Sequence, residues 1–250
     1  MSYQSTTTGP ALSAAMRRAL DAALETPPQR VRPVRAGGRM IWLKQAERLS
    51  LRWRIQKGDS VRAFEADRRA LHILAAAGLP VAPIVAEGAD YFATRDVGEP
   101  MSAMLRDETR AGADRIAAFA AAGAALAQLH SAGFAHGRPS IRDICWDGRQ
   151  ATLIDFERFS TRRNGHRRMA TDALILFHSI CTYGGGQVPE LGAAAMAWKH
   201  GVPPDVVRRL RRQARILSVL MPMVRLGLAL RPRSRELRAV PATLDFLRQF

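Results

Sequence analysis

Residues Leu126–Phe159, LAQLHSAGFAHGRPSIRDICWDGRQATLIDFERF, decide the fold of this chain. The segment starts with the end of a helix, turns through a His-Gly loop at His136, and reaches a short apolar strand at Ala151–Ile154. Two acidic residues belong to it: Asp143 lies in the loop, and Asp155 follows the strand directly. Ligands of α/β-type sites collect at the ends of strands. The pattern therefore predicts a ligand site near Asp155.

The composition is that of a folded protein with an unusual charge. The 250 residues, of which 47% are hydrophobic and 24% charged, can form one large domain or two lobes. The 38 Lys and Arg against 22 Asp and Glu give a net charge of +16. Nearly all of the excess is Arg, which binds phosphates through paired hydrogen bonds. The charge indicates an anionic partner: nucleic acid, a phospholipid headgroup or a phosphorylated glycolipid. A genome rich in Arg and Ala codons is the alternative explanation.

The cysteines and the apolar segments point to a cytoplasmic protein. Cys145 and Cys181 have no metal-ligand spacing, so neither a zinc site nor a disulfide framework is expected. The first residues show no signal-peptide pattern. The longest apolar run, Ile216–Leu230, is interrupted by Pro222 and Arg225 and is too short to span a bilayer. We expect a cytoplasmic protein, soluble or peripheral to the inner membrane.

The order of helix, His-Gly loop, strand and Asp-Phe resembles the catalytic core of the protein-kinase-like superfamily, with its H-G-D-x-x-x-x-N loop and its D-F-G or D-F-E triplet. In this register His136 opens the loop, Arg138 replaces the catalytic Asp, and Asp143 replaces the Asn. The resemblance implies an α+β, two-lobed fold with a reduced mixed N-lobe and a mainly helical C-lobe. It also implies a catalytic loop of His136, Arg138 and Asp143, in which His136 is structural, Mg²⁺ bound by Asp143 and Asp155, and Asp172 as the anchor of the loop.

A hairpin and a lysine are expected near the start of the N-lobe. Val31–Arg35 and Met40–Lys44 flank Gly37-Gly38, which predicts a strand, a tight turn and a second strand. Lys44 ends the apolar second strand. The resemblance implies that Lys44 contacts the phosphates of ATP; an exposed lysine at a strand end is the alternative.

A strong helix is predicted at Ser60–Ala77, after a basic segment at 47–59 that is either a third strand or a connector. The resemblance implies that an acid of this helix pairs with the strand lysine. We favour Asp67 over Glu65, with an ordinary surface charge as the alternative. Asp96–Gly98 corresponds to the hinge, whose backbone groups would bind adenine.

One branch of the superfamily is most similar. Trp42-Leu43-Lys44, Arg62-Ala63-Phe64, Gly78–Val81 and Asp155-Phe156-Glu157 resemble segments of bacterial Kdo and lipopolysaccharide-core sugar kinases. This implies ATP- and Mg²⁺-dependent phosphorylation of a hydroxyl on an anionic glycolipid or sugar acceptor. The chain departs from the pattern in two ways: no G-x-G-x-x-G loop precedes the lysine, and Arg138 occupies the place of the catalytic acid. The alternative is therefore a catalytically inactive pseudokinase that binds nucleotide or acts as a scaffold.

The chain is expected to divide into a tail and helix at 1–28, an N-lobe at 29–98 and a C-lobe at 99–250. A basic loop at 158–168 corresponds to a substrate-contacting segment. Residues 204–230 are expected to be helical, basic first and apolar afterwards, which suits an anionic membrane surface as well as an ordinary core helix. Nucleic acid is disfavoured as a partner, because only the positive charge points to it and the sequence contains no recognisable nucleic-acid-binding motif.

Overall fold

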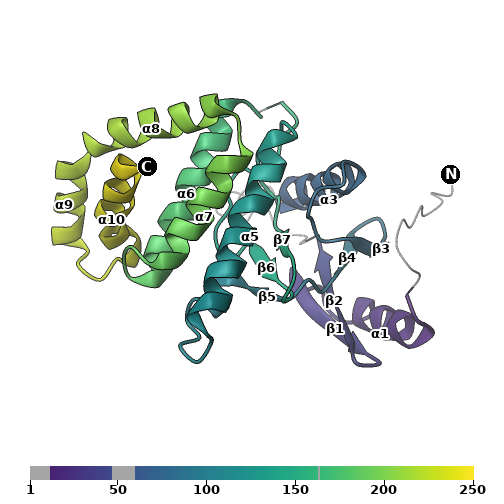
Figure 1. The fold of residues 1–250 in the computed structure, drawn as a ribbon. Helices are drawn as coiled ribbons and strands as arrows, with labels where there is room; N and C mark the ends of the chain where they lie inside the picture. The colour runs from purple at the N-terminus through teal and green to yellow at the C-terminus, as the bar shows by residue number, and fades with distance from the viewer. Residues whose placement is uncertain (1–11, 47–59, 163) are drawn as a thin grey trace. The chain divides into compact units, whose positions relative to one another are not determined.

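The computed structural model of the protein describes residues 12–46, 60–162 and 164–250 (Figure 1). The predicted strand or connector at 47–59 lies outside the described residues. The chain divides into two compact units, which are treated separately below. The N-terminal unit comprises Met1–Val97 and Phe156–Arg158, and the C-terminal unit comprises Gly98–Asp155 and Phe159–Phe250.

The N-terminal unit contains one antiparallel sheet with strand order β1-β2-β4-β3 and two described helices. The elements are α1 (Ala14–Leu24), β1 (Val31–Ala36), β2 (Arg39–Gln45), α3 (Ser60–Ala76), β3 (Ile84–Glu87) and β4 (Tyr91–Arg95). The predicted hairpin is confirmed. Gly37 and Gly38 join β1 to β2 with φ angles of 56° and 70°, which glycine adopts without strain and a two-residue hairpin turn of this type requires.

The two faces of the sheet have different partners. Leu43 of β2 pairs with Ala93 of β4, and both belong to a core cluster that includes residues of α1. The next pair along the strands, Lys44 and Phe92, points to the opposite face because side chains alternate along a strand. There the Phe92 ring lies 5.1 Å from the ring of Phe64 in α3. Because side chains alternate between the two faces along β2, Lys44 lies on the face that α3 covers.

The C-terminal unit is mainly helical and carries a small sheet of order β5-β6-β7. Its elements are β5 (Glu99–Pro100), α4 (Met101–Met104), α5 (Gly112–Ser131), β6 (Ile144–Trp146), β7 (Ala151–Leu153), α6 (His166–Gly184), α7 (Pro189–Gly201), α8 (Pro204–Ser218), α9 (Met221–Leu230) and α10 (Arg235–Gln249). A small antiparallel sheet in one unit and a mainly helical second unit confirm the predicted α+β class.

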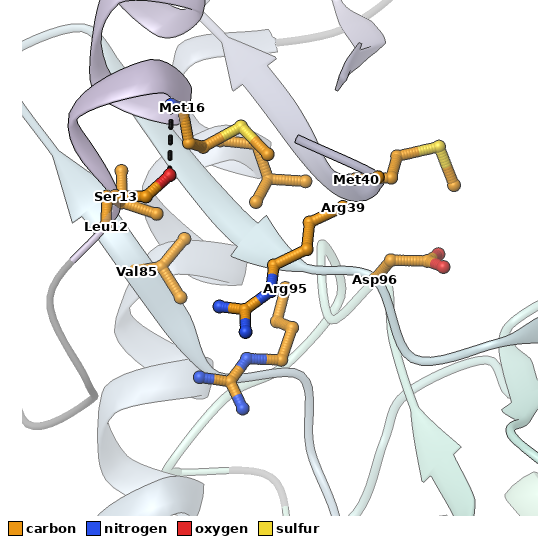
Figure 2. A pocket seen from close by; sticks show the side chains of 10 residues that line it. Leu12, Ser13, Met16, Arg39, Met40, Val85, Arg95 and Asp96 are labelled. Atoms are coloured by element: carbon orange, nitrogen blue, oxygen red, sulfur yellow. Dashed lines mark hydrogen bonds between the residues drawn. The ribbon is translucent and has the colours of Figure 1, made fainter. Parts of the chain in front are cut away.

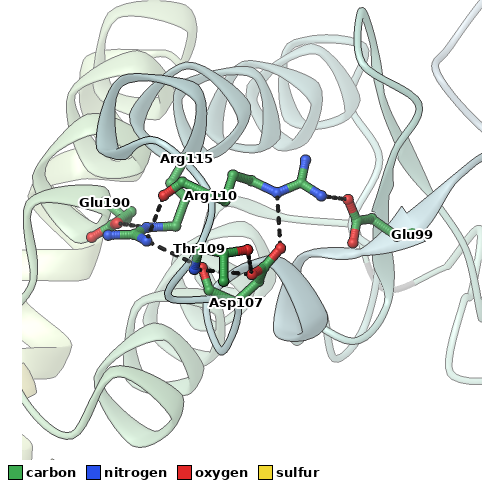
Figure 3. A network of polar contacts seen from close by, with 6 residues as sticks. All are labelled: Glu99, Asp107, Thr109, Arg110, Arg115 and Glu190. Carbon is green, nitrogen blue, oxygen red and sulfur yellow. Dashed lines mark hydrogen bonds and ion pairs between the residues drawn. The ribbon is translucent and has the colours of Figure 1, made fainter.

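Helices α5 and α7 pack closely. A Cβ atom on Gly123 of α5 would lie 2.0 Å from the carbonyl oxygen of Ala194 in α7, so only glycine allows this approach. At the start of the pair, Arg115 Nε of α5 donates to Glu190 Oε1 of α7 at 2.8 Å. Figure 3 shows that this bond belongs to a network in which Arg110 also pairs with Glu99 of β5. The network ties the segment between α4 and α5 to the rest of the unit.

Two expectations about the helices need correction. The basic loop predicted at 158–168 ends earlier, because α6 starts at His166 and includes Arg167 and Arg168 in its first turn. No described side chain caps this end, and basic residues oppose the helix dipole there, so the sequence lacks the usual start signals. The helical segment predicted at 204–230 is interrupted after Ser218, since Pro222 lacks the N–H that a continuous helix would use.

Within the described residues, no single helix has the length and apolar composition to cross a bilayer. Helices α8 and α9 reach that length and composition only when they are taken together as a pair, and the pair is bent by 58°.

Candidate active site

Lys44 and Asp67 form a tight ion pair in the N-terminal unit. Lys44 Nζ of β2 lies 2.6 Å from Asp67 Oδ2 of α3, and their side chains are 12% and 4% exposed. Of the two acids that the sequence left as candidates, Asp67 is therefore the partner. Glu65 instead pairs with Arg68 in its own helix at 2.8 Å. A buried ammonium held by a carboxylate of a neighbouring helix has a fixed position, and an ammonium in such a position can contact a phosphate.

Glu157 is a second partner of Lys44 that the sequence did not reveal. Its Oε1 lies 2.8 Å from Lys44 Nζ, and Arg30 Nη2 contacts the same carboxylate at 2.6 Å. Burial acts to raise the pKa of Glu157, but the charges and hydrogen bonds of Lys44 and Arg30 outweigh it and lower the pKa. Glu157 is thus an anion that shares Lys44 with Asp67. The only sequence signal for it was its place after Asp155-Phe156.

The loop that starts at His136 is anchored by Asp172 of α6, as the resemblance implied. The carboxylate of Asp172, which is fully buried, accepts a hydrogen bond from His136 N at 2.7 Å and one from Gly137 N at 3.1 Å. Further along the loop, Ile141 N donates to Ser179 Oγ of α6 at 3.1 Å. Backbone donors satisfied by buried acceptors fix the path of this loop on α6.

The two histidines of the region have structural partners. His136 Nε2 lies 3.0 Å from the carbonyl oxygen of Ile154, so the ring donates there and joins the loop to the end of β7. His130 is buried, and its Nδ1 accepts a hydrogen bond from Trp198 Nε1 at 3.0 Å, while its Nε2 lies 3.5 Å from Asp172 Oδ2. Burial lowers the pKa of His130, against the raising effect of Asp172. Neither ring is placed as a free base by these contacts.

Asp143 and Asp155 influence each other electrostatically. Burial and then the negative charge of Asp155 raise the pKa of Asp143, while His136 and the hydrogen bond from Ser140 N act in the opposite direction. That hydrogen bond reaches Asp143 Oδ2 at 3.0 Å. Asp155 adopts the left-handed conformation with φ of 65°, the one described residue other than glycine with positive φ. Such strained positions cluster at ligand-binding sites.

Arg138 and Asp96 are the remaining predicted site residues. Arg138 is exposed in the loop after His136. Asp96 Oδ1 accepts a hydrogen bond from Trp42 Nε1 at 2.9 Å. Asp96 also lines a cavity of about 550 Å³ into which Arg39 and Arg95 project their guanidinium groups (Figure 2). Lys44 and Asp67 are not part of its lining, and a role of Asp96 in adenine binding stays a prediction.

Each unit carries charged side chains whose chemistry can be described separately. In the N-terminal unit, Lys44 is a buried cation held by Asp67. In the C-terminal unit, Asp143 and Asp155 offer carboxylate oxygens, the ligands that Mg²⁺ prefers. The buried anchor Asp172 keeps the loop that carries Asp143 in place.

Comparison with known proteins gives a consistent assignment. Residues 29–183, more than half of the chain, match the profile of the lipopolysaccharide kinase (Kdo/WaaP) family. An uncharacterized protein of Haemophilus influenzae is 32% identical over 153 residues, which are 61% of this chain and 63% of that protein. The chain therefore spans less than two thirds of the length of that relative.

Two solved structures also align with the chain. The bifunctional kinase-methyltransferase WbdD matches with a TM-score of 0.45 and 14% identity, over 70% of this chain and 43% of WbdD. WbdD bound to a kinase inhibitor matches with a TM-score of 0.44 and 13% identity, over 71% of this chain and 45% of that chain.

Proposed function

This chain belongs to the lipopolysaccharide kinase (Kdo/WaaP) family, and from that premise we propose that it transfers a phosphoryl group from ATP to a hydroxyl of a lipopolysaccharide-type sugar. The observation that carries the proposal is the pair Asp143 and Asp155. Burial and then the charge of Asp155 raise the pKa of Asp143, so a bound cation would stabilise the ionised form of these carboxylates. The acceptor sugar is the anionic partner that the strongly basic composition calls for.

The donor set fits Mg²⁺. Carboxylate oxygens are hard ligands, and Mg²⁺ is commonly bound by one or two carboxylates together with phosphate oxygens of the substrate. Asp143 and Asp155 would hold the ion. When bound, it would neutralise charge on the phosphates of ATP. Because Asp143 occupies the place of the family's Asn, the site carries one more negative charge and should depend more strongly on the cation.

The residues of the chain then divide the work. Lys44 contacts phosphate oxygens and is kept in position by Asp67. The acceptor hydroxyl oxygen attacks the γ-phosphorus, the bond from that phosphorus to the β–γ bridging oxygen breaks, and ADP leaves with the electron pair. Asp143 orients the hydroxyl and takes its proton. Arg138 stabilises negative charge on the transferring group, since a guanidinium is not a base at neutral pH.

A specific observation favours a second function, a nucleotide-binding pseudokinase. Lys44 is already neutralised by two carboxylates, Asp67 and Glu157. Arg138 occupies the place of the catalytic acid. Such a protein would bind ATP without transferring its phosphate.

Nucleotide binding is tested by thermal denaturation of the full chain with ATP, with and without Mg²⁺. We expect a Mg²⁺-dependent rise in Tm that Asp155→Ala abolishes, because the variant loses a carboxylate for the cation. Asp245→Ala is the matched control, since Asp245 pairs only on the surface with Arg248. No rise in the wild-type protein would reject both the kinase and the nucleotide-binding pseudokinase.

Transfer is tested separately with ATP labelled in its γ-phosphate and dephosphorylated lipopolysaccharide as acceptor. Label in the sugar, lost in the Asp143→Ala variant, supports the kinase. Nucleotide binding without label in any hydroxyl acceptor supports the pseudokinase.

A further inference from the structure

Helix α9 exposes an apolar face. Met223, Leu226 and Leu230 follow one another at intervals of three and four residues, so they lie on one side of the helix. They are 70%, 63% and 76% exposed. The other side packs on α10, where Gly227 lies beside Leu237. In Figure 1, α9 is the outermost helix of the C-terminal unit. A contiguous apolar face of this kind marks a surface that a partner covers.

Exposed apolar residues also occur in the last turn of α8 and in the turn that joins it to α9. Ile216, Val219 and Leu220 are 58%, 77% and 45% exposed. The chain bends by 58° between the two helices. Exposed apolar side chains therefore occur on both sides of the bend and in the turn itself.

The charge of this segment has a single sign. Every charged residue from Val206 to Arg235 is an arginine. Arg209, Arg212 and Arg215 of α8 are exposed, and no carboxylate of the described residues forms an ion pair with them. Without compensating acids, these guanidinium groups need an anionic partner or water.

A groove of about 420 Å³ between α6 and α8 brings the two kinds of residue together. Its lining includes Arg167 and Leu174 of α6 and Arg209, Arg212 and Ile216 of α8. Cations and apolar side chains thus border the same hollow. This suits a molecule that carries an anionic group next to hydrocarbon.

We propose that the α8–α9 elbow, residues Arg209–Leu230, docks on the surface of a bilayer that contains anionic phospholipids. The arginines of α8 contact headgroup phosphates, and the exposed face of α9 enters the boundary between headgroups and acyl chains. The arginines of α8 followed by the exposed apolar residues of α9 favour an anionic bilayer over other partners. Nucleic acid would satisfy the arginines but leave the α9 face in water. A second copy of the chain would cover that face but bring like charges together.

Docking is tested by flotation of the full chain with vesicles of phosphatidylcholine alone or mixed with phosphatidylglycerol, without nucleotide. We expect binding to the mixed vesicles only. The binding should weaken when the ionic strength rises from about 0.1 M to about 1 M, which shortens the Debye length from about 10 Å to about 3 Å. Met223→Glu/Leu226→Glu and Arg209→Glu/Arg212→Glu should each reduce the bound fraction at least about tenfold.

Matched controls separate the elbow from general changes in charge or apolar surface. Arg17→Glu/Arg18→Glu reverses two exposed arginines of α1, and Ile116→Glu/Met196→Glu replaces residues that are 41% and 48% exposed on α5 and α7. Both controls should bind the mixed vesicles like the wild-type protein. Circular dichroism checks that every variant is folded.

Several results would overturn the proposal. Equal binding to both kinds of vesicle would show that the arginines do not contribute to docking. Normal binding by the folded elbow variants would place the contact elsewhere. Resistance of the bound protein to alkaline carbonate would indicate insertion. Salt-sensitive binding to unrelated DNA without vesicle binding would favour nucleic acid, and a dimer that Met223→Glu/Leu226→Glu dissociates, without vesicle binding, would favour a second copy.

Discussion

Replacing Asp172 by Asn should detach the loop that starts at His136 while leaving the volume of the side chain unchanged. The carboxylate of Asp172 accepts from His136 N at 2.7 Å and from Gly137 N at 3.1 Å. An Asn amide has one acceptor oxygen. In the place of Oδ2 this oxygen would keep the bond from His136 N and a longer contact of 3.3 Å with Gly137 N, while the NH₂ group would replace Oδ1 and face Gly137 N. The variant therefore loses the negative charge and the shorter of the two bonds from Gly137 N.

The expected loss follows from these contacts. A hydrogen bond to a charged group contributes about 1.5–3 kcal/mol and one to a neutral group about 0.5–1.5 kcal/mol, so two bonds weakened by the loss of charge cost about 2–4 kcal/mol together. We expect Asp172→Asn to lower the free energy of unfolding of the C-terminal unit by about 2–4 kcal/mol. For chains of about 150–250 residues each kcal/mol corresponds to about 2–4 °C, so Tm should fall by about 4–16 °C.

The assay is urea and thermal denaturation monitored by circular dichroism, together with hydrogen exchange of the loop amides. Asp245→Asn is the matched control, because the side chain of Asp245 is 55% exposed and pairs with Arg248. That control should stay within about 0.5 kcal/mol of the wild-type protein. Faster exchange at His136 and Gly137 in the Asp172→Asn variant would show that the loop itself is released. A variant as stable as the control, with unchanged exchange at both amides, would refute the reasoning.

Two further predictions concern Lys44 and His130. Glu157→Gln removes a carboxylate that lies 2.8 Å from Lys44 Nζ and competes with phosphate for it. Calorimetry should therefore show that the variant binds ATP about fivefold more tightly, whereas the control Glu65→Gln should bind ATP like the wild-type protein. Weaker binding by Glu157→Gln would mean that Glu157 helps to hold the nucleotide. Burial lowers the pKa of His130 below its usual 6.5; Asp172 acts to raise this pKa, and the charge of His136 acts to lower it further. Unfolding therefore takes up a proton, and the stability contributed by neutral His130 is complete above pH 6.5 and lost as the pH falls toward the folded-state pKa. In the His130→Gln variant, Tm should fall less steeply than in the wild-type protein as the pH is lowered from about 7.5 to about 5. An unchanged slope would mean that other groups cause the pH dependence of Tm.

The local structure of the N-terminal unit followed from local signals. Gly37-Gly38 between apolar runs predicted the hairpin, and the helical spacing of Phe64, Leu71 and Leu74 predicted α3. The pairing of Lys44 with Asp67 was predicted from the resemblance and the position of Asp67 in that helix. These inferences succeeded because each rests either on residues that are close together in the chain or on the resemblance to the kinase-like sequence pattern.

Contacts between distant segments left no such signal. Arg30 and Glu157 are 127 positions apart, and nothing in either neighbourhood indicates that they meet. The start of α6 was missed because His166, Arg167 and Arg168 oppose the helix dipole, so packing of its apolar face must outweigh an unfavourable end. The exposure of the α9 face could not be separated from burial, because amphipathic helices read alike whether they face a core or a membrane.

Asp67 shows why a short acid suits its position. Its Oδ2 contacts Lys44 at 2.6 Å, and its Oδ1 accepts a hydrogen bond from Phe156 N at 2.8 Å, so one carboxylate joins β2, α3 and the Asp-Phe-Glu triplet. Glu at this buried position would carry an extra methylene and could not keep both contacts without displacing one. The same carboxylate therefore positions Lys44 and the backbone amide of Phe156 within the N-terminal unit. Loss of Asp67 should disturb both of these groups, whereas loss of Glu157 should leave Lys44 paired with Asp67.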